Sequence, residues 1–259
     1  GCVTAARCGC RGRRSPSDAR TEAGSHVTPQ GALKSRTGAG AGRFGGSIRA
    51  TLWPTRAFAG GVRWFDELYV WTEGAAPTVT QRARIQINAL RDTFKWLEYD
   101  LVEQVGVTIS FGTVERALDP LNALFERNVL LAHRTYVMLR GAPDRLRSRY
   151  RLRGFAEMLR GLGYHVGYRI SAPRVGMELR GVELVRPEFA KVLATTANRE
   201  EAWTDLAAEV RAVGLDTRTT IIGGVQEAEQ ARMAALAGFE LGQGLAIRPP
   251  YPPPSLRRR

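Results

Sequence analysis

The chain has 259 residues, of which 44% are hydrophobic, and this is enough for one large α/β domain or two small ones. The formal net charge of +13 raises nucleic acid as a partner, but the chain has no groove-reading motif and no basic stripe interleaved with aromatic residues, so nucleic-acid binding is not expected. No apolar run approaches the roughly 20 residues of a membrane span and no signal peptide is visible, so we expect a cytoplasmic protein.

The two ends of the chain differ in composition from its middle. Residues 1–25 are rich in glycine, arginine, serine and alanine, which predicts a disordered basic arm, and the three cysteines, Cys2, Cys8 and Cys10, all lie in it. A C-x-C pair can bind a soft metal, but no fourth ligand is nearby, so a disordered arm is the favoured interpretation. Residues 253–259 form a proline-containing basic tail. The folded domain is therefore expected at 26–252.

Strands and helices alternate along the domain. β-branched and aromatic runs between glycine and proline predict strands at 43–53, 61–71, 105–110, 135–141, 164–170, 181–186, 217–222 and 241–247. Apolar residues at helical spacing predict helices at 79–104, 117–128, 151–163, 188–214 (broken near Asn198) and 227–238. Repeated alternation of this kind is typical of parallel βα units.

Two parallel α/β architectures fit this alternation, an eight-stranded barrel and a doubly wound open sheet. No G-x-G-x-x-G follows the first strand and no P-loop is present, so the nucleotide-binding open sheets lose their main support. The sequence therefore favours a (β/α)8-type barrel, whose functional surface lies at the carboxyl ends of the strands.

One strand-to-helix junction resembles an active-site turn without its charges. In "TTIIGGVQEAEQ" (219–230) a β-branched run meets Gly223 and Gly224, and no ionisable side chain precedes Glu227. The longer segment through "GFELGQGLAIRPPYP" resembles the EAL-domain family, barrel enzymes that linearise the bacterial second messenger cyclic di-GMP. The matching residues are Gly224, Val225, Gln230, Leu236, Gly238, Gln243, Gly244 and Pro249.

The resemblance extends over about residues 27–252. "VGVTISFGTVERALDPLNALFE", "RTYVMLRG", "MLRGLGYHVGYRISAP" and "VELVRPEFAKVL" stand where the family has its conserved segments, and "PQGALKSRTGAGAGRFGGSIRATLWP" is similar to its opening, more loosely. The resemblance implies a modified TIM-type (β/α)8 barrel of the EAL kind. In this family two divalent ions, held by carboxylates and one asparagine, activate water at the phosphodiester.

The first half of the family's site is replaced in this alignment. The glutamate of the EAL signature falls at Ile48, within Ile48-Arg49-Ala50, and the signature's guide arginine falls at Leu52. The metal-binding asparagine falls at Thr108. The two glutamates of the next segment fall at Val137 and Arg140.

The second half is replaced as well. The paired aspartates fall at Arg169–Ile170, the catalytic lysine at Leu184 and the neighbouring aspartate at Arg186. The glutamates of the family's "AEGVE" fall at Gly223 and Gln226, and the loop after the paired aspartates reads Ser171-Ala172. Residues 48–53, 135–140, 164–171 and 219–226 contain no aspartate or glutamate. The resemblance therefore implies a pseudo-phosphodiesterase with no catalytic residue, no metal site and no cofactor.

Two functions from different classes follow. The first is a catalytically inactive regulator or adaptor in cyclic di-GMP-linked signalling, acting through an unidentified protein partner. The alternative is a metal-independent receptor for cyclic di-GMP or another phosphate ligand, because arginine forks bind phosphate in a bidentate way. Its candidate ligand-binding residues are Arg140, Arg169, Arg186, Gln243 and Pro249. Against this, the arginines can be ordinary surface residues, and Gln230, Gln243 and Gly244 can serve only to shape the last βα turn.

A new catalytic function and a dimer are weaker expectations. Ser110, His165 and Glu183 are the other reactive groups expected near strand ends, and His165 with Glu183 is the one conceivable acid/base pair. The helices predicted at 79–104 and 188–214 could provide a homodimer face, although a helix with a broad apolar stripe normally faces its own core.

Overall fold

The computed structural model describes residues 47–74, 76–142, 148–170, 175–194 and 199–255. The predicted arm at 1–25 with its cysteines, the loop residues Ser171-Ala172, the predicted break near Asn198 and the last four residues of the tail lie outside the described residues. All described residues belong to one compact unit, Gly31–Arg259.

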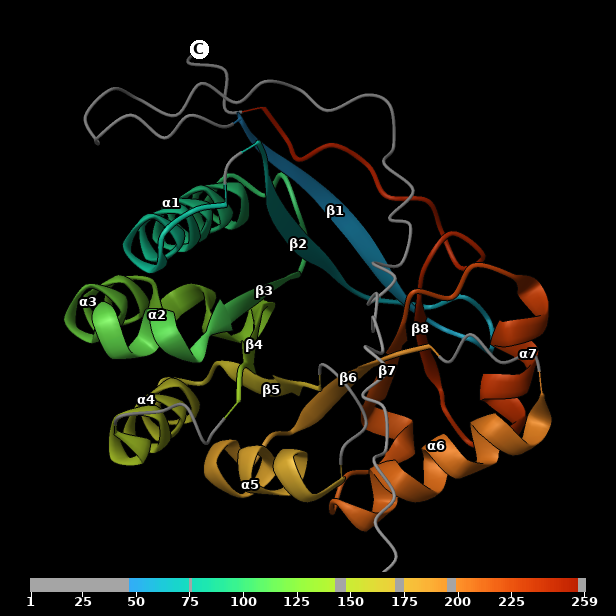
Figure 1. The fold of residues 1–259 in the computed structure, drawn as a ribbon. Helices are drawn as coiled ribbons and strands as arrows, with labels where there is room; N and C mark the ends of the chain where they lie inside the picture. The colour runs from blue at the N-terminus through green and yellow to red at the C-terminus, as the bar shows by residue number, and fades with distance from the viewer. Residues whose placement is uncertain (1–46, 75, 143–147, 171–174, 195–198, 256–259) are drawn as a thin grey trace, which may run out of the picture. The chain divides into compact units, whose positions relative to one another are not determined.

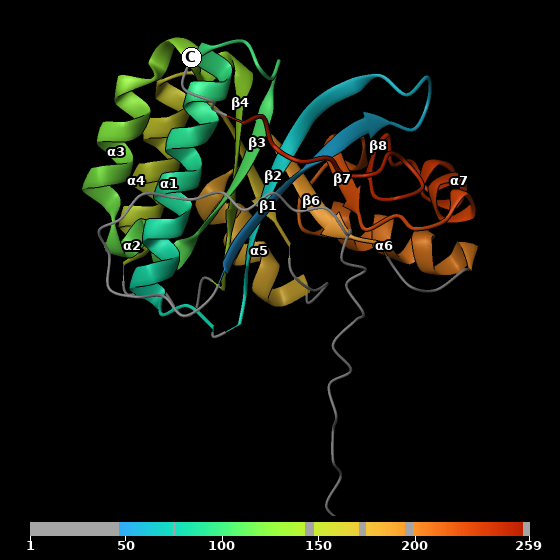
Figure 2. The ribbon, with the colours of Figure 1, turned by 90° about the horizontal axis from the view of Figure 1, so that it is seen from above.

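Eight strands close into a barrel in chain order, as Figures 1 and 2 show from two directions. The strands are β1 (Ser47–Ala57), β2 (Arg63–Glu73), β3 (Val105–Ser110), β4 (Thr135–Arg140), β5 (His165–Arg169), β6 (Phe189–Leu193), β7 (Thr220–Gly223) and β8 (Leu241–Gln243). β1 runs antiparallel to both of its neighbours, β2 and β8, whereas β2 to β8 are parallel throughout. The prediction of a modified (β/α)8 barrel is confirmed.

Helices follow the parallel strands from β2 to β7. They are α1 (Val79–Glu98), α2 (Phe111–Arg116), α3 (Leu118–Arg127), α4 (Arg149–Gly161), α5 (Val175–Val185), α6 (Glu200–Ala212) and α7 (Ala228–Leu236), with short 3-10 turns η1 (Val129–Arg134) and η3 (Thr217–Thr219). None of the helices in the described residues is long and apolar enough to cross a membrane.

The sequence prediction fails around residues 181–193. The segment 181–186, predicted as a strand, is the second half of α5, and 188–193, predicted as the start of a helix, is essentially β6. A short apolar run that is buried on both faces has no period that separates strand from helix. β6 is such a run, since four of its five residues are buried. Because of this error, the position at which the sequence predicts a site lysine, Leu184, lies in α5 and not in a strand.

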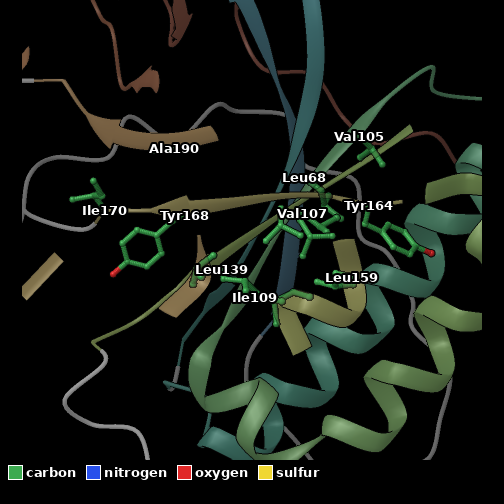
Figure 3. Close-up of a cluster of buried hydrophobic side chains, with 14 of the residues drawn as sticks. Leu68, Val105, Val107, Ile109, Leu139, Leu159, Tyr164, Tyr168, Ile170 and Ala190 are labelled. Carbon is green, nitrogen blue, oxygen red and sulfur yellow. The ribbon is translucent and has the colours of Figure 1, made fainter. Parts of the chain in front are cut away.

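The core has two parts, one outside the barrel and one inside it. The helices pack on the outer faces of the strands through aliphatic and aromatic side chains, several of which Figure 3 shows between β3, β4, β5 and α4. The amphipathic stripe of α1, including Ile87, Leu90, Phe94 and Leu97, is buried and so belongs to this core. Its second predicted role, as a dimer face, stays a prediction.

An aromatic plug closes the interior of the barrel below the site. Phe65, Tyr136 and Phe189 pack together, with the Phe65 and Tyr136 rings stacked at a centroid distance of 4.5 Å. The wall is built to admit them, because a Cβ at Gly106 would lie 2.4 Å from the Phe65 ring and a Cβ at Gly167 would lie 2.4 Å from the Phe189 ring. The plug occupies the amino-terminal half of the barrel, so the polar residues above it face the carboxyl ends of the strands.

Candidate functional site

A buried ion pair lies at the centre of the barrel. Glu67 on β2 is 1% exposed, and its carboxylate accepts a hydrogen bond from Lys191 Nζ on β6. Thr108 Oγ1 on β3 donates to the same carboxylate at 3.0 Å, and Arg169 Nη1 on β5 lies 3.9 Å from it. Four parallel strands thus converge on this one acidic group.

Lys191 is also tied to the end of the barrel sheet. Its amino group donates to Gln243 Oε1 on β8, and Gln243 Nε2 donates to Trp53 O at 3.0 Å and to Thr55 Oγ1 at 3.2 Å, both on β1. Gly223 on β7 makes room for this arrangement, since a Cβ there would lie 2.5 Å from Lys191 Cε. A side chain at position 223 is therefore incompatible with Lys191 in its present position.

Burial and neighbouring charges act on the pKa values of both partners. Burial by itself would raise the pKa of Glu67, but the ammonium of Lys191 and then the guanidinium of Arg169 outweigh it and hold this pKa below its ordinary value. Burial lowers the pKa of Lys191, the charge of Arg169 lowers it further, and the carboxylate of Glu67 offsets these effects only in part. The carboxylate of Glu67 therefore already accepts hydrogen bonds from Lys191 and Thr108 and is the counter-ion of Lys191.

Above the ion pair, arginines line the barrel mouth. A pocket of about 300 Å³ is lined by three arginines, Arg82 on α1, Arg140 on β4 and Arg169 on β5, together with the aromatic residues Tyr69 and Trp71 of β2. Arg140 and Arg169 are Cα partners across neighbouring strands. Burial lowers the pKa of Arg140, and the charges of Arg169 and Arg82 lower it further.

The mouth has a surplus of positive charge. The side chains of Arg82 and Arg140 make no hydrogen bond or ion pair with any residue that the structure describes, and Arg169 shares Glu67 with Lys191. Four cationic side chains around one carboxylate leave a local charge of +3 on these described groups.

The residues in the mouth do not fit the divalent ions that act in the EAL family. Mg²⁺ requires several oxygen ligands, mostly anionic, at fixed positions. Among the described residues no three histidine, cysteine, aspartate or glutamate side chains gather in a way that could hold a metal. Glu67, the carboxylate that Lys191 and Arg169 approach, is already paired with Lys191. This donor set favours an anion over a cation.

The structure separates the predicted ligand-binding residues into two groups. Arg140 and Arg169 lie together in the mouth, and Gln243 is 4% exposed in the barrel, where it orients Lys191. Arg186 lies in the loop that enters β6 at its amino-terminal end, so its predicted place in the mouth is wrong. Pro249 is exposed in the segment after β8 and does not line the pocket.

Sequence reasoning missed the two central residues of the site. It placed the family's lysine at Leu184, which lies in α5, whereas the buried lysine is Lys191 of β6. It placed the EAL glutamate at Ile48, which lies near the start of the antiparallel strand β1, and overlooked Glu67. A signal was present, because Asp66-Glu67 interrupts an otherwise aromatic and aliphatic strand, and a charge there needs a buried partner.

The predicted acid/base pair is also not formed. His165, at the start of β5, stacks on Tyr136 at 4.5 Å between centroids and lies 3.2 Å from Glu188. Glu183 is exposed on α5. Ser110 caps α2, where Thr113 N donates to Ser110 Oγ at 3.2 Å. These three residues therefore have structural surroundings, and they do not form an acid/base site together.

Comparison with solved structures identifies the architecture. The phosphodiesterase PaMucR in its c-di-GMP complex superimposes with a TM-score of 0.58 at 15% sequence identity, covering 79% of this chain and 97% of that one. The fold is that of an EAL domain. Klebsiella pneumoniae BlrP1 with calcium and c-di-GMP (TM-score 0.62, 14% identity) and the Bacillus subtilis YkuI protein with substrate c-di-GMP and calcium (0.59, 12%) have it too.

Sequence similarity adds nothing to this likeness. No protein-family model matches the chain, and no curated protein matches it. The match to BlrP1 includes 79% of this EAL-like chain but only 56% of BlrP1. The match to YkuI includes 78% of this chain but only 54% of YkuI. At 12–15% identity the likeness defines the fold alone, and the chemistry has to be argued from the residues of this EAL-like barrel.

Proposed function

We propose that this EAL-like domain does not hydrolyse cyclic di-GMP and acts as a regulatory or adaptor domain in cyclic di-GMP-linked signalling, through contact with a protein partner. The observation that carries the proposal is the buried pair of Glu67 and Lys191. A carboxylate that is neutralised by an ammonium and bordered by Arg169 at 3.9 Å is a poor ligand for a divalent ion. The barrel is retained, and its buried carboxylate is already engaged by two cationic side chains, Lys191 and Arg169.

The proposal is tested by incubating the full chain with cyclic di-GMP and either MgCl₂ or MnCl₂, and separating the nucleotides by chromatography. We expect no linear dinucleotide after a time in which the phosphodiesterase PaMucR, as positive control, converts all of the substrate. Metal-dependent conversion that disappears in the variant Glu67→Gln would refute the proposal, because it would show that Glu67 acts as a metal ligand.

A second candidate function is favoured by the arginines of the mouth. Arg82, Arg140 and Arg169 surround a pocket of about 300 Å³. Guanidinium groups make charge-assisted, bidentate hydrogen bonds to phosphate oxygens, and Tyr69 and Trp71 offer aromatic surface for a nucleobase. A receptor that binds cyclic di-GMP or another phosphate ester without metal fits these groups.

Calorimetry separates the two candidates. If the mouth is a receptor, cyclic di-GMP binds equally well in MgCl₂ and in EDTA, and Arg140→Gln weakens binding at least about fivefold. Arg153→Gln is the matched control, since Arg153 is exposed on α4 and pairs only with Glu157, at 2.8 Å, in the described structure. No heat with cyclic di-GMP or pyrophosphate up to millimolar concentration would leave protein contact as the function of the domain.

A further inference from the structure

A second cavity lies outside the barrel, away from the mouth. It has a volume of about 530 Å³, and its walls are the end of β1, the β1–β2 hairpin, one face of α7 and residues 246–248. Figures 1 and 2 both show the hairpin beside α7, next to β8. None of its lining residues is shared with the pocket in the mouth. We call this cavity the α7 groove.

The α7 groove has the shape of a helix-packing surface. α7 contributes Ala228, Ala231, Arg232 and Ala235, which are spaced i, i+3, i+4 and i+7 and so lie along one face. The opposite face of α7, with Met233 and Ala234, is buried against the barrel. Small alanine side chains on the outward face leave space for another helix to approach closely.

The position of the groove matches a helix that is absent from the described chain. Each parallel strand from β2 to β7 is followed by a helix on the outside of the barrel. After β8, residues 244–255 contain no helix and instead run back to β1, where Tyr251 pairs with Leu52. The groove between α7 and the β1–β2 hairpin is therefore where an eighth helix would cover the barrel.

The groove combines an apolar floor with positive charge. Phe58 and Ile247 line it together with the alanines. Arg56, Arg232 and Arg248 supply positive charge, and of these Arg232 is paired with Glu229 on α7. None of the described residues that line it is acidic, and Arg56 Nε is buried without a hydrogen-bond partner among the described residues. Hydrophobic residues next to the lining are unusually exposed, with Val62 at 68% and Leu236 at 60%.

We infer that the α7 groove docks an acidic amphipathic helix of a protein partner, at the place where the described chain has no eighth helix. The inference deepens the proposed regulatory function, on which it rests, by naming a contact surface and the chemistry of its partner. Charge favours this occupant over a segment of the same chain or a second copy. Residues 1–46 carry eight lysines and arginines against two carboxylates, residues 256–259 read Leu-Arg-Arg-Arg, and a second copy brings a net charge of +13.

The probe is an 18-residue helical peptide with leucines on one face and glutamates along both flanks, labelled for fluorescence anisotropy. Its matched control carries lysine at every glutamate position. The full chain is expected to bind the acidic peptide at least about tenfold more tightly than the basic one. Ala231→Trp, which fills the groove, and Arg248→Glu, which reverses a charge at its edge, are each expected to weaken the acidic peptide at least about fivefold.

The control variant is Arg153→Glu, an exposed arginine on α4, which should change the affinity less than about twofold. Thermal unfolding of each variant confirms that the barrel is intact. Equal binding of the two peptides, no binding of the acidic peptide, or an equal loss in Arg153→Glu overturns the inference. A dimer in sedimentation that Ala231→Trp dissociates assigns the groove to a second copy and also overturns it. Cyclic di-GMP hydrolysis, measured on the same sample, tests the proposed function separately.

Discussion

Replacing Lys191 with methionine removes the cation from the barrel and keeps a side chain of similar length in the space beside Gly223. Removing one partner of a buried ion pair costs about 3–5 kcal/mol, because the other charge remains buried without compensation. In this barrel Thr108 still donates to Glu67 at 3.0 Å and Arg169 lies at 3.9 Å, so the expected loss is at the lower end, about 3 kcal/mol. For a domain of this size that corresponds to a decrease in melting temperature of roughly 6–12 °C.

The measurement is urea unfolding at pH 7, followed by the fluorescence of the five tryptophans, for the wild type, Lys191→Met, Glu67→Gln and the double variant. If Glu67 and Lys191 form an ion pair that depends on both partners, the double variant is more stable than Lys191→Met alone by about 1–2 kcal/mol. The reason is that the carboxylate left without its counter-ion in Lys191→Met is absent from the double variant. A loss below about 1 kcal/mol in Lys191→Met, or a double variant no more stable than that single variant, would refute the reasoning.

The remaining predictions concern space, charge and pH. Gly223→Ala places a Cβ 2.5 Å from Lys191 Cε and should destabilise the domain by about 1–3 kcal/mol in urea unfolding, whereas Gly161→Ala, at a helix position with nothing within 4 Å, should not destabilise it. Arg140→Gln removes a repelling charge from the mouth, so its melting temperature should equal or exceed that of the wild type even where its anion affinity falls. Because the pKa of Glu67 is depressed in the folded state, the stability that its charge contributes is fully present above about pH 4.5 and is lost as the pH falls through the folded pKa. Glu67→Gln should therefore lose less stability than the wild type on acidification. The same decrease in unfolding free energy with falling pH in both proteins would contradict this.

The fold was largely predictable from the sequence because its elements have clear periods and boundaries. The strand predicted at 105–110 matches β3 residue for residue, and 135–141 and 164–170 match β4 and β5 to within one residue at each end. Glycine and proline mark these boundaries, and β-branched residues fill the strands. The alternation of these elements was sufficient to predict a barrel before any family was considered.

The site was harder to predict because it depends on register. The pairing of β2 with β3 and of β6 with β7 decides that Glu67 and Lys191 meet, and the two residues are 124 positions apart in the chain. The strand predicted at 181–186 lies too early in the chain, because the observed strand is β6 (Phe189–Leu193). The expected lysine therefore fell at Leu184 and the expected mouth arginine at Arg186, both outside β6. Charged residues in buried strands are paired across the barrel by tertiary structure, which local sequence patterns do not encode.

The positive charge of the barrel mouth was easier to predict than the buried ion pair, because it did not require the exact position of each residue in its strand. Arg140 and Arg169 end neighbouring parallel strands, so their meeting followed from the barrel topology alone. Arg82 was not anticipated, because it reaches the pocket from α1 and not from a strand end. Helix residues that face the mouth become visible only when the helix is placed on the barrel.

If the barrel mouth of this EAL-like domain favours anions over divalent cations, a free divalent ion should not bind there. The most direct measurement is Mn²⁺ binding by the full chain, followed by the loss of the free-ion signal in electron paramagnetic resonance, with and without cyclic di-GMP. We expect no Mn²⁺ bound in the mouth up to about 1 mM, since Glu67 is paired with Lys191 and bordered by Arg169. Stoichiometric Mn²⁺ binding that Glu67→Gln abolishes would contradict this expectation.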